Sequence, residues 1–165
     1  MSTKKYIIMG IDPGIAVTGY GVIEINGGTA RMLDFGAVRT TPEEKKEERL
    51  CRIHDGLTNV IKKFKPDAVA IELLFFNRNT KTALSVGEAR GVALLAAGRC
   101  GCNVFEYTPL QVKECLTGYG RTVKNSLREV VQMELEMEKP PSPIDASDAL
   151  ALAITHHYFS GINEV

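Results

Sequence analysis

The sequence predicts an α/β fold with a five-stranded mixed sheet, flanked by helices, in which the first three strands are antiparallel. Short, mostly apolar segments of strand length come before or between longer segments with helical spacing. Three strand-like segments precede the first helix, and the later strands alternate with helices. A strong turn signal, Asn26-Gly27-Gly28, separates the second and third segments and predicts an antiparallel hairpin.

The expected strands are apolar or β-rich segments bounded by turn residues. Residues 6–11 are apolar throughout, as in a central strand that is buried on both faces. Residues 18–25 and about 31–39 form the hairpin, and residues 68–71 form a second fully apolar strand. A short strand is expected at 103–107. The two fully apolar segments are therefore the strongest candidates for the interior of the sheet.

Helices are expected at about 41–64, 80–99, 122–138 and 144–158, with a short one opening at Pro109. The first is expected to start at Thr41-Pro42-Glu43-Glu44, since proline and acidic residues favour a first helical turn. The last follows a proline-rich linker and is apolar nearly all round. It is therefore expected to be buried.

Length and composition narrow the class of protein. The chain has 165 residues, of which 44% are hydrophobic and 24% charged, so we expect a single globular domain over residues 1–165. Its four cysteines lack zinc-ligand spacing and are expected to be reduced thiols. No apolar run reaches the ~20 residues of a membrane span, and the first residues lack a signal-peptide pattern. A cytoplasmic protein with no membrane partner is expected.

Four carboxylates stand where chemistry is expected. Asp12 and Glu72 each follow a fully apolar strand, and ligands of open α/β sheets bind at the carboxyl ends of parallel strands. Asp145 and Asp148 are three residues apart at the start of the last helix and share one face. Clustered oxygen ligands without thiolates are typical of Mg²⁺ sites. Two such ions can clamp the attacking and leaving oxygens of a phosphodiester.

Each acid also has a purely structural interpretation. Asp12 can start the Asp-Pro-Gly turn, and Glu72 can be a solvated strand end. Asp145 can close a capping box that begins at Ser142, and Asp148 can complement the helix dipole. A purely structural role for all four acids is the less favoured interpretation, because two strand ends and one helix start supply a set of carboxylates that is compatible with one metal site.

Five segments closely resemble the RuvC-type Holliday junction resolvases of bacteria: residues 10–14, 17–23, 71–76, 88–93 and 145–151. The resemblance runs in order from about residue 6 to 157. It implies a ribonuclease H-like fold and a Mg²⁺-dependent endonuclease with about two ions per site, for which Mn²⁺ can substitute. The family's catalytic and metal-binding carboxylates fall on Asp12, Glu72, Asp145 and Asp148. Glu88 and Asn125 depart from the family, since many relatives carry Gln at these positions.

The basic residues near the middle of the chain are candidates for DNA contacts. Net charge is zero, with 20 basic and 20 acidic residues, so a polyanion must be bound by local charge. Between residues 108 and 128 the basic side chains outnumber one acid, Glu114, by three; they are Lys113, Arg121, Lys124 and Arg128. The alternative is a solvated basic face. The resemblance implies that Lys113 and Lys124 contact DNA.

Phe75 and Phe76 follow Glu72 and precede a helix. Neighbouring residues of a strand face opposite ways, so one ring can be exposed beside the acids and stack on an unpaired base. The alternative is that both rings pack beneath the helix. The resemblance implies that Phe75 is the stacking residue.

A stripe of small residues, Ala83, Gly87 and Gly91, lies on one face of the helix predicted at 80–99. It allows another backbone to approach, and the alternative is close packing on the chain's own sheet. The resemblance implies that this region forms a two-fold homodimer, which matches the two equivalent strands of a four-way DNA junction. It also implies the branch-migration proteins RuvA and RuvB as partners.

Two other functions fit the sequence less well. An actin-like kinase or ATPase shares an Asp-x-Gly and a Thr-Gly signal, but it needs two such domains and a longer chain. A non-catalytic junction-binding module is expected to lack one of the acids, and none is missing here.

Overall fold

A single sheet organises the computed structural model, which describes residues 5–74, 80–118 and 126–161. Its strand order is β3-β2-β1-β4-β5. The strands are β1 (Tyr6–Asp12), β2 (Val17–Asn26), β3 (Thr29–Arg39), β4 (Ala68–Glu72) and β5 (Asn103–Tyr107). β1, β2 and β3 are antiparallel neighbours, while β4 is parallel to both β1 and β5. The predicted mixed sheet, with its first three strands antiparallel, is therefore confirmed.

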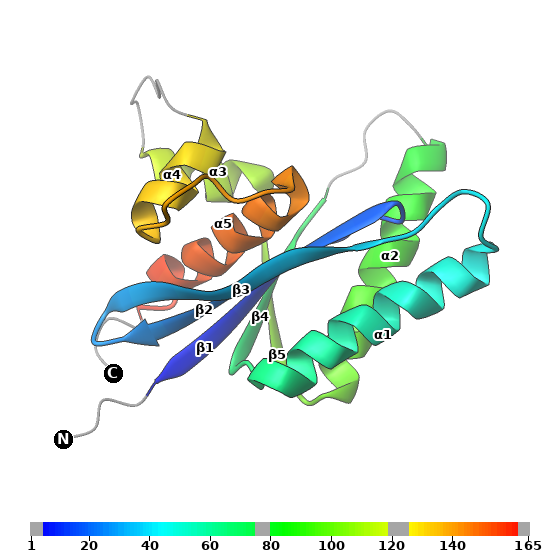
Figure 1. The fold of residues 1–165 in the computed structure, drawn as a ribbon, viewed down its shortest axis with the longest axis horizontal. Coiled ribbons are helices and arrows are strands. Elements are labelled where there is room, and N and C mark those ends of the chain that lie inside the picture. The colour runs from blue at the N-terminus through cyan, green and yellow to red at the C-terminus, as the bar shows by residue number, and fades with distance from the viewer. Residues whose placement is uncertain (1–4, 75–79, 119–125, 162–165) are drawn as a thin grey trace.

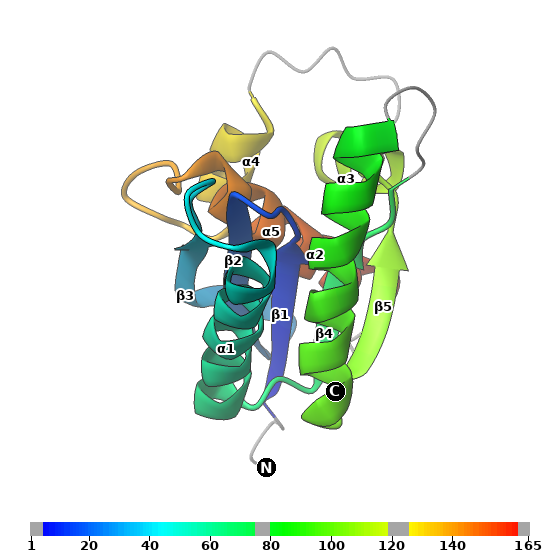
Figure 2. The ribbon, with the colours of Figure 1, turned by 90° about the vertical axis from the view of Figure 1, so that its right-hand side faces the viewer.

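Helices cover both faces of this sheet (Figures 1 and 2). α1 (Lys46–Phe64) and α2 (Thr80–Arg99) pack together on one face, over the core that includes Met9 and Ile71. α5 (Ile144–Phe159) packs on the other face, over Ile8. α3 (Pro109–Thr117) and α4 (Leu127–Glu134) pack against α5 rather than on the centre of the sheet. β1 is consequently covered on both sides, as its unbroken apolar sequence predicts.

The buried helix near the C-terminus is also confirmed. Every residue of α5 from Ala149 to His157 is buried, including both histidines. None of the helices that the structure describes combines the length and the hydropathy needed to cross a lipid bilayer.

Two helix boundaries differ from those expected. α1 begins at Lys46 rather than near residue 41, because Thr40 is tied to the β1–β2 turn and the following residues form a turn of their own. Glu47 and Glu48, not the two preceding acids, occupy the first helical turn. α4 ends at Glu134, since Glu136 adopts a left-handed backbone with φ of 50° that a helix cannot contain. Its expected start at 122–125 lies outside the described residues.

Candidate active site

The site begins with two neighbouring strands. β1 and β4 pair in parallel with Ile11 opposite Ile71, so Asp12 and Glu72 leave the same edge of the sheet side by side. The two strands are therefore neighbours, as the placement of both acids in one crevice requires.

The third component is the N-terminal part of α5, which lies directly on the sheet. A Cβ atom on Gly10 would overlap the carbonyl oxygen of Ala149, and one on Gly19 would overlap that of Asp145. A Cβ atom on Gly21, which pairs with Gly10 across the strands, would lie 2.6 Å from the Leu150 side chain. The sequence analysis assigns these glycines no role, because their contacts with α5 join segments that are far apart in the chain. The feature that marks them is that Gly10 and Gly21 face each other across the β1–β2 hairpin.

Three of the four acids share one small pocket. Asp12, Glu72 and Asp148 line it, together with Pro109 and Val112 of α3, Leu127 of α4 and Leu152 of α5. Asp145 is not among the lining residues, although its charge acts on Asp12. The apolar wall from α3, α4 and α5 reduces the contact of the carboxylates with water, and this strengthens their mutual repulsion.

The electrostatics of the pocket follow from that arrangement. Burial raises the pKa of Asp12 from its ordinary 3.8 to about 8, and the charges of Glu72, Asp148 and Asp145 add to the rise. Burial, with the charge of Asp148, also raises the pKa of Glu72. The pKa of Asp148 is raised by burial and by Asp145. None of the four acids forms an ion pair with a described residue. A cluster of acids that lacks a cation partner suits a bound metal ion.

The oxygen donors fit Mg²⁺, because hard cations take carboxylate ligands. The described side chains are not already drawn together as a three-ligand metal cage. Like-charged carboxylates repel one another without a cation between them.

Three structural interpretations of these acids do not hold. Pro143, not Ser142, is the N-cap residue of α5, and it makes no side-chain capping hydrogen bond. The capping box is therefore absent, and Asp145 has no partner role in it. The turn after β1 is held by Thr18, whose hydroxyl donates to the Gly14 carbonyl at 2.6 Å, rather than by Asp12. Glu72 is half-buried in the pocket, so it is not a fully solvated strand end.

Comparison with known proteins identifies the family. The family model "Crossover junction endodeoxyribonuclease RuvC" matches residues 8–156. The chain belongs to the RuvC family. It is 51% identical over 150 residues to the family member of Ruminiclostridium cellulolyticum, covering 91% of this chain and 90% of the relative. It is 48% identical over 159 residues to that of Alkaliphilus oremlandii, covering 96% and 97%. The chain is accordingly an endodeoxyribonuclease.

A solved structure agrees with this assignment. The RuvC of Thermus thermophilus in complex with a Holliday junction substrate superposes with a TM-score of 0.88 at 39% identity, covering 94% of each chain. The ribonuclease H-like fold is thereby confirmed.

The residues expected to contact DNA divide into three groups. Lys113 is exposed on α3, one position after Val112 of the acid pocket. Phe75, Phe76, Arg121 and Lys124 lie outside the described residues. Arg128 is occupied structurally, since its Nε donates to the Pro141 carbonyl at 2.5 Å and its Nη2 to that of Pro140 at 3.3 Å. It braces the linker before α5, and the excess of positive charge available to a RuvC substrate is smaller than the sequence count suggests.

The small-residue stripe faces away from the sheet. Gly87 and Gly91 are exposed, and a Cβ atom on either would meet no atom of the described residues within 4 Å. Close packing on the chain's own sheet is therefore excluded for these two, while Ala83 is half-buried. Leu84 and Leu95 are exposed on the same helix. Glu88, one of the departures from the RuvC pattern, pairs with Lys46 of α1 at 3.2 Å.

The paired histidines of α5 serve the core. The Nδ1 atom of His156 lies 2.7 Å from the Tyr107 hydroxyl, and its ring packs on Phe105. Burial lowers the pKa of His156 to about 4, so the ring is neutral near pH 7. His157 contacts the Gly28 carbonyl at 3.3 Å, at the far end of the β2–β3 hairpin. Neither lines the pocket of the acids.

Proposed function

We propose that this protein resolves Holliday junctions by paired nicks in strands of like polarity, in homologous recombination and DNA repair. The single observation that supports this most is the pocket in which acids from β1, β4 and α5 meet without a cation partner. The RuvC family is metal-dependent. We assign Mg²⁺ as the metal, about two ions per site, with Mn²⁺ as a substitute.

In this mechanism Asp12, Glu72, Asp145 and Asp148 hold the metal. When bound, the ions supply Lewis-acid stabilisation of the charge that develops on the phosphodiester. A carboxylate of the cluster accepts a hydrogen bond from the attacking water and orients it in line with the scissile bond. The products are a 5′-phosphate and a 3′-hydroxyl. The raised pKa of Asp12 means that this group gives up a proton as the metal enters.

Substrate binding is assigned to side chains around the pocket. Lys113, Arg121 and Lys124 would contact phosphates, which position a duplex without reading its sequence. Phe75 would stack on an unpaired base, a contact that an intact duplex does not offer. The location of Lys113 on the helix that lines the pocket supports the first of these assignments.

The active unit is assigned as a homodimer that meets through the stripe of Ala83, Gly87 and Gly91. The open space beside the two glycines and the exposed Leu84 and Leu95 support this face. A two-fold dimer presents two equivalent active sites to the two equivalent strands of a four-way junction. RuvA and RuvB are the expected partners. A DNA substrate agrees with the cytoplasmic location that is expected from the sequence.

The test is cleavage of a synthetic four-way junction in Mg²⁺, beside a linear duplex of matched sequence. The wild type is expected to cut the junction symmetrically and to leave the duplex intact. Asp12→Asn and Asp148→Asn are expected to abolish cutting while junction binding in Ca²⁺ survives. Asp55→Asn, on the exposed face of α1, is the matched control and is expected to cut normally. Normal turnover by either of the first two variants contradicts the proposed site.

A further inference from the structure

The turn between β1 and β2 follows Asp12 directly, and three of its carbonyl groups accept hydrogen bonds. The Gly14 carbonyl accepts from the Thr18 hydroxyl at 2.6 Å, and the Ala16 carbonyl accepts from the Thr40 amide at 3.0 Å. The Ile15 carbonyl between them accepts from the Thr40 hydroxyl at 2.5 Å. Thr18 and Thr40 are both buried. All three carbonyls accept hydrogen bonds from the chain itself, and those of Gly14 and Ile15 are directed inward to buried threonine hydroxyls.

A second layer keeps the Thr40 hydroxyl aimed at Ile15. The Nε–H of Arg49 in α1 donates to the Thr40 hydroxyl oxygen at 2.8 Å. The Thr40 hydroxyl therefore accepts from Arg49 with a lone pair and donates its hydrogen to the Ile15 carbonyl. The turn is consequently braced by the sheet and by α1.

Peptide geometry then fixes where the amides of this turn point. The carbonyl and the N–H of a trans peptide point in opposite directions, and the peptide bonds of this turn are trans. Since the carbonyls of Gly14 and Ile15 point inward, the N–H groups of Ile15 and Ala16 point outward. No described residue accepts a hydrogen bond from either amide. Successive outward amides form a concave site of partial positive charge that suits an anion.

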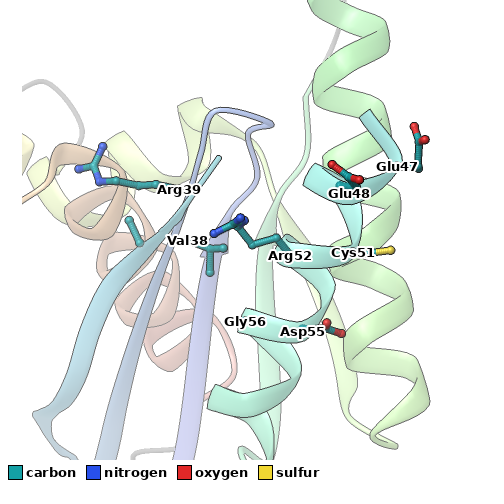
Figure 3. A pocket seen from close by; sticks show the side chains of 9 residues that line it. Val38, Arg39, Glu47, Glu48, Cys51, Arg52, Asp55 and Gly56 are labelled. Carbon is teal, nitrogen blue, oxygen red and sulfur yellow. The ribbon is translucent and has the colours of Figure 1, made fainter. Parts of the chain in front are cut away.

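The strand end next to this turn carries an arginine. Arg39 ends β3 opposite Val17, the residue that follows the turn, and it is exposed. Its side chain extends away from α1, on the opposite side of the strand from Val38 (Figure 3). It makes no ion pair or hydrogen bond with a described residue. Arg39 and Arg52 both line the groove between β3 and α1, but Arg52 is paired with Glu44 at 2.7 Å.

We infer that the amides of Ile15 and Ala16, with the guanidinium of Arg39, bind one non-bridging phosphate of the cleaved strand, next to the scissile one. The inference rests on the proposed function and adds a second anchoring point on the strand. One anchor allows the strand to rotate about the metal site, whereas two define its direction across Asp12. A backbone amide and an arginine contact phosphate irrespective of the base, so this anchor sets position and not sequence.

The experiment measures junction binding in Ca²⁺, with no cleavage, over a range of salt concentrations. Arg39→Ala is expected to reduce the magnitude of the log–log salt slope by about 0.9. Between 1 M and 0.1 M salt, the affinity of this variant therefore rises roughly eightfold less than that of the wild type. Arg31→Ala is the matched control. It is exposed on the same strand about 27 Å from Arg39, on the side away from the acids, and is expected to leave the slope unchanged.

Single methylphosphonate substitutions, which neutralise one phosphate at a time, then locate the contact. At one position near the cut, neutralisation is expected to weaken binding by the wild type and by Arg31→Ala several-fold, but to have little further effect on Arg39→Ala. Ala16→Pro, which deletes one amide hydrogen, is expected to lose sensitivity at the same position, whereas Ala16→Gly retains it.

Equal slopes for Arg39→Ala and Arg31→Ala, or no position whose sensitivity depends on Arg39, overturn the inference. Both outcomes leave the proposed function intact if the wild type still cuts junctions. A wild type that binds but does not cut contradicts the proposed function instead, and leaves the phosphate contact to be judged from binding alone.

Discussion

The backbone of Asp145 rests on the α-carbon of Gly19, with no room for a side chain between them. The same helix touches Gly10 through Ala149 one turn later. These two contacts set the height of α5 above the sheet and bring the acids of the helix to those of β1 and β4. The glycines thus act on the chemistry although neither carries a functional group.

Gly19→Ala is expected to separate α5 from the sheet by roughly 1 Å, because the obstacle is backbone and not the end of a flexible side chain. A displacement of that size can cost about 100-fold in the rate of a positioned reaction. The overpacking is expected to cost about 1–3 kcal/mol in the free energy of unfolding. Single-turnover junction cleavage and chemical denaturation measure the two effects.

Gly98→Ala is the control, since a Cβ atom there meets no described atom within 4 Å. It is expected to retain both activity and stability, with a small gain from the better helix propensity of alanine. If Gly19→Ala is as active as Gly98→Ala, the close approach of α5 does not position the acids.

The sequence predicts the four acids, and it predicts the fold well where one pattern dominates. The unbroken apolar run of β1 and the Asn26-Gly27-Gly28 turn both have the structure expected. The predicted start of α1 is wrong, because the local proline and acidic signals are outweighed by the long-range hydrogen bonds that tie Thr40 to the β1–β2 turn. The strand order and the role of Gly19 depend on pairings between distant segments, which residue patterns do not encode.

The basic cluster shows the same limit. Arg128 counts as free positive charge in the sequence, but it donates to the carbonyls of Pro140 and Pro141. No local pattern distinguishes an arginine that binds backbone carbonyls from one that is free for phosphate. The linker that it braces is thirteen residues away from it along the chain.

Stability without metal is expected to depend on pH through Asp12. Its pKa is raised from 3.8 to about 8 in the folded protein, so the folded state holds a proton that the unfolded state releases between these values. Stability from this group is therefore present below about pH 4 and is lost as pH rises to about 8. In EDTA, Asp12→Asn is expected to melt at a higher temperature than the wild type at pH 8, with the difference shrinking toward pH 4.

His156 makes this comparison between variants necessary. Its lowered pKa acts in the opposite direction, since a buried neutral histidine loses stability as pH falls below about 6.5. The effect cancels in the difference between wild type and Asp12→Asn.

Adding Mg²⁺ at pH 7 to the wild type is expected to release protons, measured by calorimetry in two buffers of different ionisation enthalpy. No proton release, and a lower melting temperature for Asp12→Asn at pH 8, contradict the raised pKa.

Lys113→Ala and Lys124→Ala are each expected to weaken junction binding and to reduce the magnitude of the log–log salt slope by about one. The reason is that each lysine neutralises one phosphate and releases one condensed counterion. Lys62→Ala, exposed near the C-terminal end of α1, serves as the control and is expected to leave the slope unchanged. Slopes for the first two variants that match the control identify the basic cluster as a solvated face.

Under the proposed homodimer, Gly91→Leu is expected to give a monomer while the fold is kept. The monomer has open space at this position, so a larger side chain strains no described part of the chain. A dimer that needs close backbone approach would be blocked by four added carbons. Asn59→Leu adds a leucine to an exposed position of α1 and controls for the change in surface hydrophobicity. Sedimentation velocity that reports the same dimer for both variants places the interface elsewhere.

Phe75→Ala tests the assignment of an exposed stacking ring. Loss of one stacked base is expected to cost roughly 1–3 kcal/mol. The loss should appear in single-turnover cleavage of the junction, because only a distorted junction presents an unstacked base. The melting temperature is expected to change little, since an exposed ring leaves no cavity when it is removed. A core phenylalanine would behave in the opposite way, with a loss of about 3–5 kcal/mol in the free energy of unfolding.

Phe76→Ala is the matched variant, because alternation along an extended chain requires neighbouring rings to face opposite sides. It is expected to lower the melting temperature and to leave cleavage at low temperature intact. The reverse result, with Phe75→Ala unstable and Phe76→Ala defective in cleavage, assigns the stacking role to Phe76. Equal loss of stability in both variants places both rings beneath α2 and removes stacking from the mechanism.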